Sequence, residues 1–75
     1  MVRLSEDNDR ISASWNADVW PFLSITHVGS DRTMLAQDLQ GGSATVTLST
    51  LEPKGSFEIS LSDGLNSTRV LRPRQ

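Results

Sequence analysis

The chain has no cysteine, so it can form neither a disulfide framework nor a cysteine-based zinc site. No apolar stretch approaches the length that spans a membrane, and no signal-peptide pattern follows Met1. Basic residues are not in excess, because nine acids against seven bases leave a net charge of -2. We therefore expect no nucleic-acid partner and no membrane insertion.

The features that usually carry catalysis are also missing. A chain of 75 residues is one small domain, without room for a cofactor fold plus a substrate cleft. His27 is the only histidine, and Asp31 nearby does not complete a catalytic triad or a zinc site. Gly41-Gly42 lies between two strand-like runs and not before a helix, so it indicates a turn. We predict that the protein is not an enzyme and uses no cofactor.

Short runs that alternate apolar and polar residues fill most of the chain, and helix signals are nearly absent. The alternation predicts strands over residues 2–5, 10–16, 22–28, 33–39, 43–49, 56–62 and 67–72. Turn residues separate these runs at roughly eight-to-twelve-residue spacing. This pattern predicts an all-β fold, a seven-stranded antiparallel sandwich of two sheets over residues 1–75.

The inward-facing apolar positions predict the core. The expected members are Trp15, Ile25, Val46, Phe57, Ile59 and Val70. His27 continues the inward series on its strand. Asp63-Gly64 predicts a hairpin turn whose loop is either residues 63–64 or residues 63–66. In both cases Thr68 and Val70 face inward, and Arg69 and Leu71 face outward.

Three segments carry a family resemblance: "SASWN", "LEPKGSF" in the pattern L-x-P-x-G-x-F, and "SDGLN". Together, from about Arg10 to Val70, they resemble a fibronectin type III or immunoglobulin-like module of the kind appended to bacterial secreted peptidases and other exported multidomain proteins. The resemblance implies that Trp15 lies on the second strand and that a Leu51-x-Pro53 turn precedes Phe57 on the sixth. The chain departs from the family because Phe57 stands where a tyrosine is commoner, so the tyrosine's corner hydrogen bond is missing.

A candidate binding site follows from the expected topology, which places three loops at one end of the sandwich. Trp20, Asp18, Gln40 and Asn66 are its predicted ligand-binding residues, with Asn16 and Asp63 beside them. An aromatic ring among amides and carboxylates suits a sugar or a peptide. The alternative is structural: Trp20 caps the open end of a thin core, and the loops are polar because they are loops.

Two further motifs have structural alternatives. Glu6, Asp7 and Asp9 are a weak calcium candidate, because hard cations bind clustered oxygens but the spacing of an EF-hand is absent. Arg72 and Arg74 are expected to return to the same place and balance these acids. Asn66-Ser67-Thr68 matches a glycosylation acceptor, which we expect to be unmodified in a bacterial protein.

The function we expect is that of a non-catalytic accessory module that spaces or positions a neighbouring domain. The resemblance implies a secreted or cell-envelope location, and the ends of the chain suggest a piece cut from a longer polypeptide. We expect a monomer whose partners are the neighbouring domains of the same polypeptide. The alternative is a carbohydrate- or protein-binding module that uses the loops around Trp20.

Overall fold

The strands form where apolar and polar side chains alternate along the chain. The computed structural model describes residues 2–7, 9–48 and 54–74, and these residues form seven strands. The strands are β1 (Arg3–Asp7), β2 (Arg10–Ser14), β3 (Phe22–Val28), β4 (Arg32–Leu39), β5 (Ser43–Thr47), β6 (Ser56–Ser62) and β7 (Ser67–Pro73). No helix in this described part of the chain is long and apolar enough to cross a membrane.

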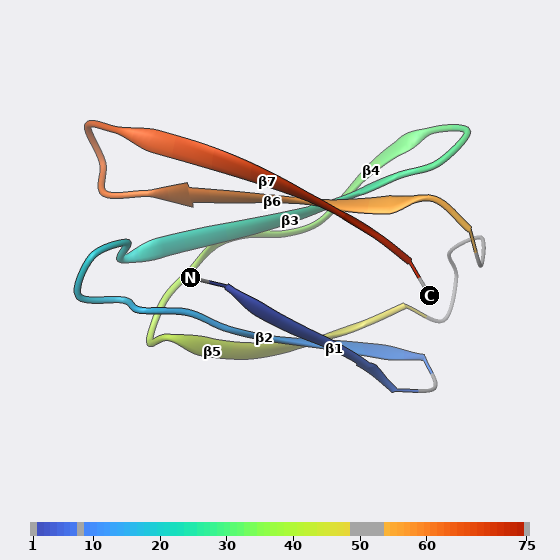
Figure 1. The fold of residues 1–75 in the computed structure, drawn as a ribbon, viewed down its shortest axis with the longest axis horizontal. Coiled ribbons are helices and arrows are strands. Elements are labelled where there is room, and N and C mark those ends of the chain that lie inside the picture. The colour runs from blue at the N-terminus through green and yellow to red at the C-terminus, as the bar shows by residue number, and fades with distance from the viewer. Residues whose placement is uncertain (1, 8, 49–53, 75) are drawn as a thin grey trace.

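The strands form two antiparallel sheets that face each other (Figure 1). One sheet has the order β1-β2-β5, and the other has the order β4-β3-β6-β7. The predicted all-β sandwich is therefore confirmed. The fourth strand pairs with β3, whereas in a constant-type immunoglobulin domain it joins the sheet of the first, second and fifth strands. As a result, the sheet that contains β5 is one strand narrower than the sheet opposite.

The core lies between the sheets and follows the alternation. On β2 and β6, every second side chain is buried, and its neighbours point outward. The buried apolar residues are Val2, Ile11, Ala13, Trp15, Leu23, Ile25, Leu48, Phe57, Ile59 and Leu61. Four of the six predicted core residues are among them. Val46 and Val70 are only half-buried, because β5 and β7 are edge strands with no further strand beside them.

Strand boundaries differ from the prediction at the N-terminus. The expected strands 2–5 and 10–16 place the acidic run in a turn between them, yet β1 continues until Asp7 pairs with Arg10. Glu6 likewise pairs with Ile11 in the same ladder. An edge strand with one face in solvent accepts charged side chains, so the charges did not end the strand. The two expected strands 10–16 and 43–49 are shorter, ending at Ser14 and Thr47.

The hairpin between β6 and β7 has the longer of the two expected loops. Leu61 lies opposite Thr68, and Ile59 lies opposite Val70, so residues 63–66 form the loop. Thr68 and Val70 share the inward side, as predicted, although Thr68 is exposed. Leu71 points outward and is 60% exposed. The predicted parity of β7 is therefore confirmed.

The first and last strands run in the same direction along one side of the sandwich. Both are edge strands, and side chains from β7 and from the residue that follows it reach the N-terminal segment. Arg72 Nη2 donates to the carbonyl oxygen of Val2 at 3.4 Å, and Arg74 forms an ion pair with Glu6 at 3.0 Å. The expected balance between the C-terminal arginines and the acidic run is thus realised by the pair Arg74–Glu6.

Candidate functional site

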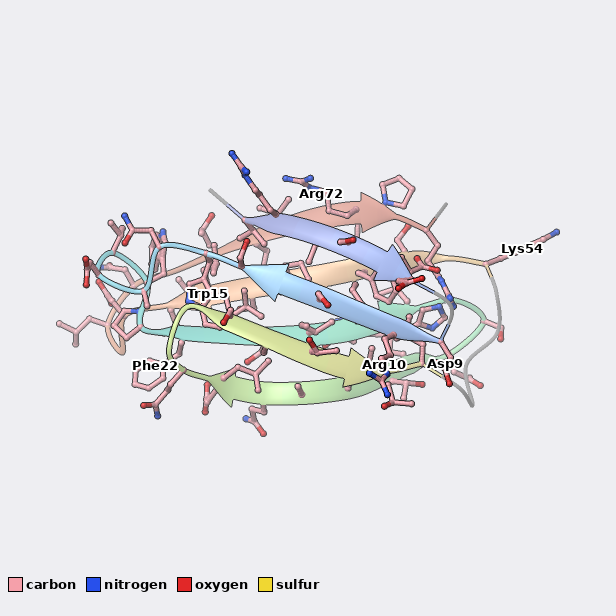
Figure 2. All side chains as sticks on the ribbon, turned by 90° about the horizontal axis from the view of Figure 1, so that it is seen from below. Asp9, Arg10, Trp15, Phe22, Lys54 and Arg72 are labelled. Carbon is pink, nitrogen blue, oxygen red and sulfur yellow. The ribbon has the colours of Figure 1, made fainter. Side chains whose placement is uncertain are left out.

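One end of the sandwich carries loops 15–21, 40–42 and 63–66, and we call it the Trp20 end. The three loops lie together at the left of Figure 1. Loop 29–31 and residues 54–55, just before β6, lie at the opposite end, which we call the His27 end (Figure 1). In Figure 2, Trp15 lies toward the Trp20 end, whereas Asp9, Arg10 and Lys54 lie toward the His27 end.

Loop 15–21 is held by its own hydrogen bonds. The side-chain oxygen of Asn16 accepts from the amide of Asp18 at 3.0 Å, which is an Asx turn. The backbone carbonyl of Asn16 accepts from the amides of Val19 and Trp20 at 3.2 and 3.0 Å. Asn16 is therefore a turn-forming residue whose side-chain oxygen is already engaged.

Trp20 rests on the core. Its side chain is half-buried and packs against the hydrophobic cluster. Its carbonyl oxygen accepts a hydrogen bond of 2.8 Å from Nε1 of Trp15, which satisfies the one polar atom of that buried ring. This geometry favours the structural interpretation, in which Trp20 covers the end of the core, over that of a fully exposed aromatic anchor.

Loop 40–42 is fastened to the same tryptophan. The amide of Trp15 donates to the carbonyl oxygen of Gly42 at 2.9 Å. Gly42 has a φ of +86°, and a Cβ on it would lie 3.2 Å from the carbonyl oxygen of Trp15. The glycine therefore permits both the turn and the close approach. Gln40 is exposed beside it.

Loop 63–66 is organised by Asp63. Its carboxylate Oδ1 accepts from the amides of Asn66 and Leu65 at 2.6 and 2.8 Å. These hydrogen bonds to the charged form, that of Asn66 first, lower the pKa of Asp63 below its ordinary value of 3.8. The amide of Asp63 in turn donates to the carbonyl oxygen of Asn66 at 3.1 Å. Asp63 is thus a turn-forming residue that holds loop 63–66 in shape.

The loops that carry the predicted ligand-binding residues lie at the same end of the sandwich. Asp18, Gln40 and Asn66 are exposed. Among the described residues, no hydrogen bond or ion pair links loop 63–66 to either of the other two loops. Whether these residues bind a ligand stays a prediction.

Two exposed apolar residues at this end were missed. Val19 is 56% exposed and Leu65 is 94% exposed. The sequence contained a signal for Leu65 only under the longer of the two expected loops, residues 63–66, which places Leu65 in the turn. Val19 lacked one, since an apolar residue beside Trp20 could equally have packed inward.

The acidic run offers little to a metal ion. Glu6 is engaged by Arg74, while Asp7 and Asp9 are exposed. Within residues 2–7, 9–48 and 54–74, no three His, Asp or Glu side chains are close enough together to hold a metal. The calcium candidate made of Glu6, Asp7 and Asp9 therefore stays a prediction.

The His27 end contains the one buried titratable ring. His27 is 2% exposed and faces inward, as predicted. Its Nε2 donates to the carbonyl oxygen of Lys54 at 2.8 Å, and its ring meets Phe57 edge-on at 5.8 Å between centroids. The Arg74 guanidinium lies 5.5 Å from the centroid of the same Phe57 ring. Leu51 and Pro53, to which the resemblance assigned a turn, lie outside the described residues.

Comparison of the chain with protein-family models, with curated proteins and with solved structures finds no match.

Proposed function

We propose that this protein is a non-catalytic accessory module that holds a neighbouring domain at a set distance in an exported multidomain protein. The proposal rests on the course of the first and last strands, β1 and β7. Strand β1 begins beside Ser14, near the Trp20 end, and β7 ends beside Ser56, at the His27 end. A chain that enters toward one end and leaves at the other, in a body 32 Å long, separates its neighbours.

The attachments of the last strand support this proposal. The amide of Arg74 donates to the carbonyl oxygen of Gly55 at 2.9 Å, and its guanidinium pairs with Glu6. The exit of the chain is thereby tied to both sheets. A spacer needs such ties, because a frayed terminal strand would transmit no fixed orientation.

We further infer that the sandwich is of the fibronectin type III or immunoglobulin-like kind. Support comes from seven described strands in sheets of three and four, with Trp15 next to the second strand and Phe57 in the core on the sixth. The secreted or cell-envelope location and the bacterial source rest on the resemblance alone and remain proposals.

The spacer proposal can be tested by placing the full chain between two spin-labelled reporter domains. Pulsed electron resonance would then measure the distribution of distances between the labels. We expect a narrow distribution. A Gly/Ser linker of equal length is the control, and its end-to-end distance should spread broadly around roughly 50 Å. A distribution as broad as that of the linker would refute the spacer.

The alternative function, binding of a carbohydrate or protein at the Trp20 end, has one specific observation in its favour. Val19 and Leu65 expose apolar surface there beside the polar Asp18 and Asn66. A glycan array probed with the wild-type chain and with Leu65→Ser tests it. Binding that Leu65→Ser abolishes without changing the melting temperature would favour this alternative over a pure spacer.

A further inference from the structure

The sandwich has four edge strands, and three of them are protected against pairing with another chain. Strands β1 and β7 carry charged residues, and β7 also ends in Pro73. Strand β4 has two irregularities in its pairing with β3, and Asp38 on it has a φ of +54°. Charges, proline and bulges are the usual means by which edge strands avoid unwanted pairing.

Strand β5 has none of these protections. Its sequence, Ser-Ala-Thr-Val-Thr, contains no charge and no proline, and its pairing with β2 is continuous from Ser43 to Thr47. Such a strand is a ready template for one more strand. It is also one of the two outer strands of the three-stranded sheet, which is the narrower of the two sheets.

The hydrogen-bonding direction of each β5 residue can be worked out. The Trp15 amide donates to the Gly42 carbonyl, and the Leu48 amide donates to the Asp9 carbonyl. In an antiparallel ladder these hydrogen-bonded pairs alternate with pairs whose backbone groups point away from each other. The pairs Ala44–Ala13 and Val46–Ile11 therefore bond to β2. The amides and carbonyls of Ser43, Thr45 and Thr47 point to the outer edge.

A side-chain distance agrees with this assignment. In pairs that are not hydrogen-bonded, the side chains of opposite residues come closer together. The hydroxyl oxygens of Ser12 and Thr45 are 3.2 Å apart, as expected for such a pair. No hydrogen bond joins the outward backbone groups of β5 to another described residue.

Apolar side chains line the core side of the space beside the outer edge of β5. Strand β4 curves from the four-stranded sheet towards β5 at its Leu39 end (Figure 1), and it lies outside β5 in the view of Figure 2. Leu35 and Leu39 of β4, with Ala44 and Val46 of β5, are half-buried on the core side. An additional strand beside β5 would cover these four side chains and would make the two sheets equal in width.

Charge sets a preference at one end of this edge. Arg10 lies opposite Thr47 and is exposed, and it forms no ion pair with another described residue. Figure 2 shows it beside the tip of β5, at the His27 end. An added strand with a carboxylate at that end would complement the guanidinium.

We propose that the outer edge of β5 accepts an extended peptide of a partner protein as an eighth strand. The peptide has apolar residues at alternate positions, which cover Leu35, Leu39, Ala44 and Val46, and an acidic residue level with Arg10. Its backbone pairs with Ser43, Thr45 and Thr47. The mode is strand addition, in which the backbone supplies affinity and alternate side chains supply specificity.

The first test needs only the free protein. Amide hydrogen exchange, followed by NMR, should be fast at Ser43, Thr45 and Thr47 and slow at Ala44 and Val46. Protection of all five amides in the dilute protein would overturn the proposal. Protection of the outer three that grows with protein concentration would show that a second copy of the chain occupies the edge, and would overturn it too.

The second test is a titration with a blocked synthetic peptide of about seven residues, alternating valine and threonine and ending in glutamate. We expect saturable shifts of the three outer amides and loss of their exchange. The same peptide N-methylated at alternate residues keeps every side chain but cannot pair, and it should not bind. Equal binding of both peptides, or no saturable shift at about 1 mM peptide, would overturn the proposal.

Two variants at Thr45 make the test specific to the backbone. Thr45→Pro removes an outward amide without removing a bond to β2, and proline is tolerated at such edge positions. Thr45→Val loses the same hydroxyl contact to Ser12 but keeps the amide. We expect Thr45→Pro to abolish the shifts and Thr45→Val to retain them. Loss of binding in both variants would assign the effect to the hydroxyl instead, and would refute backbone pairing.

Discussion

At the Trp20 end, polar side chains bond to the backbone of their own loops, whereas at the His27 end they bond to residues far away along the chain. Asn16 and Asp63 accept from amides two or three residues away. His27, by contrast, bonds to the carbonyl of Lys54, and Arg74 bonds to Glu6. Local hydrogen bonds shape a turn without needing the rest of the fold, and the distant ones join elements that only folding brings together.

This difference teaches where composition misleads. The Trp20 end contains the amides, carboxylates and aromatic ring that are typical of a binding site, yet much of that chemistry is used to form turns. The His27 end contains the buried polar groups, whose loss should matter more for stability, because a buried group without its partner keeps the full cost of desolvation. Measured stabilities can therefore sharpen the comparison or contradict it.

The largest effect should come from Phe57→Ala at the His27 end. Phe57 is 2% exposed and is contacted by the His27 ring and the Arg74 guanidinium. Its truncation should cost about 3–5 kcal/mol, enough to unfold a domain of this size. Urea denaturation followed by tryptophan fluorescence would measure it, and a midpoint that hardly moves would contradict the assigned core.

Gly55→Ala should follow. The residue has a φ of +107°, and an added Cβ would lie 2.5 Å from the carbonyl oxygen of Val28 and 3.1 Å from Nε2 of His27. Strain and overpacking together should cost about 2–4 kcal/mol. Thermal unfolding would measure the loss. A neutral result would mean that Val28 and His27 yield easily, and it would remove the contrast between the two ends.

Trp20→Ala probes the opposite end. The Trp20 ring is half-buried, and the backbone carbonyl of Trp20 accepts a hydrogen bond from the Trp15 ring. We therefore expect the free energy of unfolding to fall by about 2–3 kcal/mol, less than for Phe57→Ala. The same urea experiment applies. An unchanged midpoint, together with a lost ligand on the glycan array, would mean that Trp20 is an exposed anchor and that its packing is incidental.

Gly64→Ala is the matched counterpart of Gly55→Ala. Gly64 has a φ of +96°, but nothing lies within 4 Å of the position of an added Cβ. Only the backbone conformation opposes the change, so the loss should be about 1 kcal/mol. If the two alanine variants are equally destabilised, the crowding at Gly55 contributes nothing.

The smallest effect should appear as a pH dependence. The pKa of Asp63 is lowered by the amides of Asn66 and Leu65, so its contribution to stability is present above its unfolded pKa and is lost as pH falls through its folded pKa. Asp63→Asn keeps a side-chain acceptor but does not titrate there. The stability difference between wild type and Asp63→Asn should therefore shrink in acid.

Glu58→Gln provides the comparison for that experiment. Hydrogen bonding from Arg32, at 2.9 Å, lowers the pKa of Glu58, so this carboxylate also loses its contribution in acid. Its site is the outer face of the four-stranded sheet and not a turn. A pH dependence that disappears in Glu58→Gln but persists in Asp63→Asn would assign the acid sensitivity to the sheet face and contradict the role given to Asp63.

Much of the fold was predictable because alternation is a local property. The inward position of His27 and the burial of Trp15 each follow from the two-residue period of side chains along a single strand. The burial of Val46 and Val70 was overestimated, because whether an inward residue is fully covered depends on whether another strand lies beside its own. The candidate site was predictable only as a set of loops at one end, since loop hydrogen bonds such as those of Asn16 cannot be read from composition.

The sequence by itself determined seven alternating strands, their facing directions and the parity of the last hairpin, because each depends on residues near one another in the chain. Only the tertiary structure decided that the fourth strand joins β3, that Arg74 meets Glu6, and that β5 is left with an outer edge. Those outcomes depend on which strands lie next to each other. That arrangement is decided when the two sheets bury their apolar faces against each other. A charge-free strand such as β5 looks ordinary in the sequence, and it becomes a candidate interface only once the structure shows that no described residue bonds to its outer backbone groups.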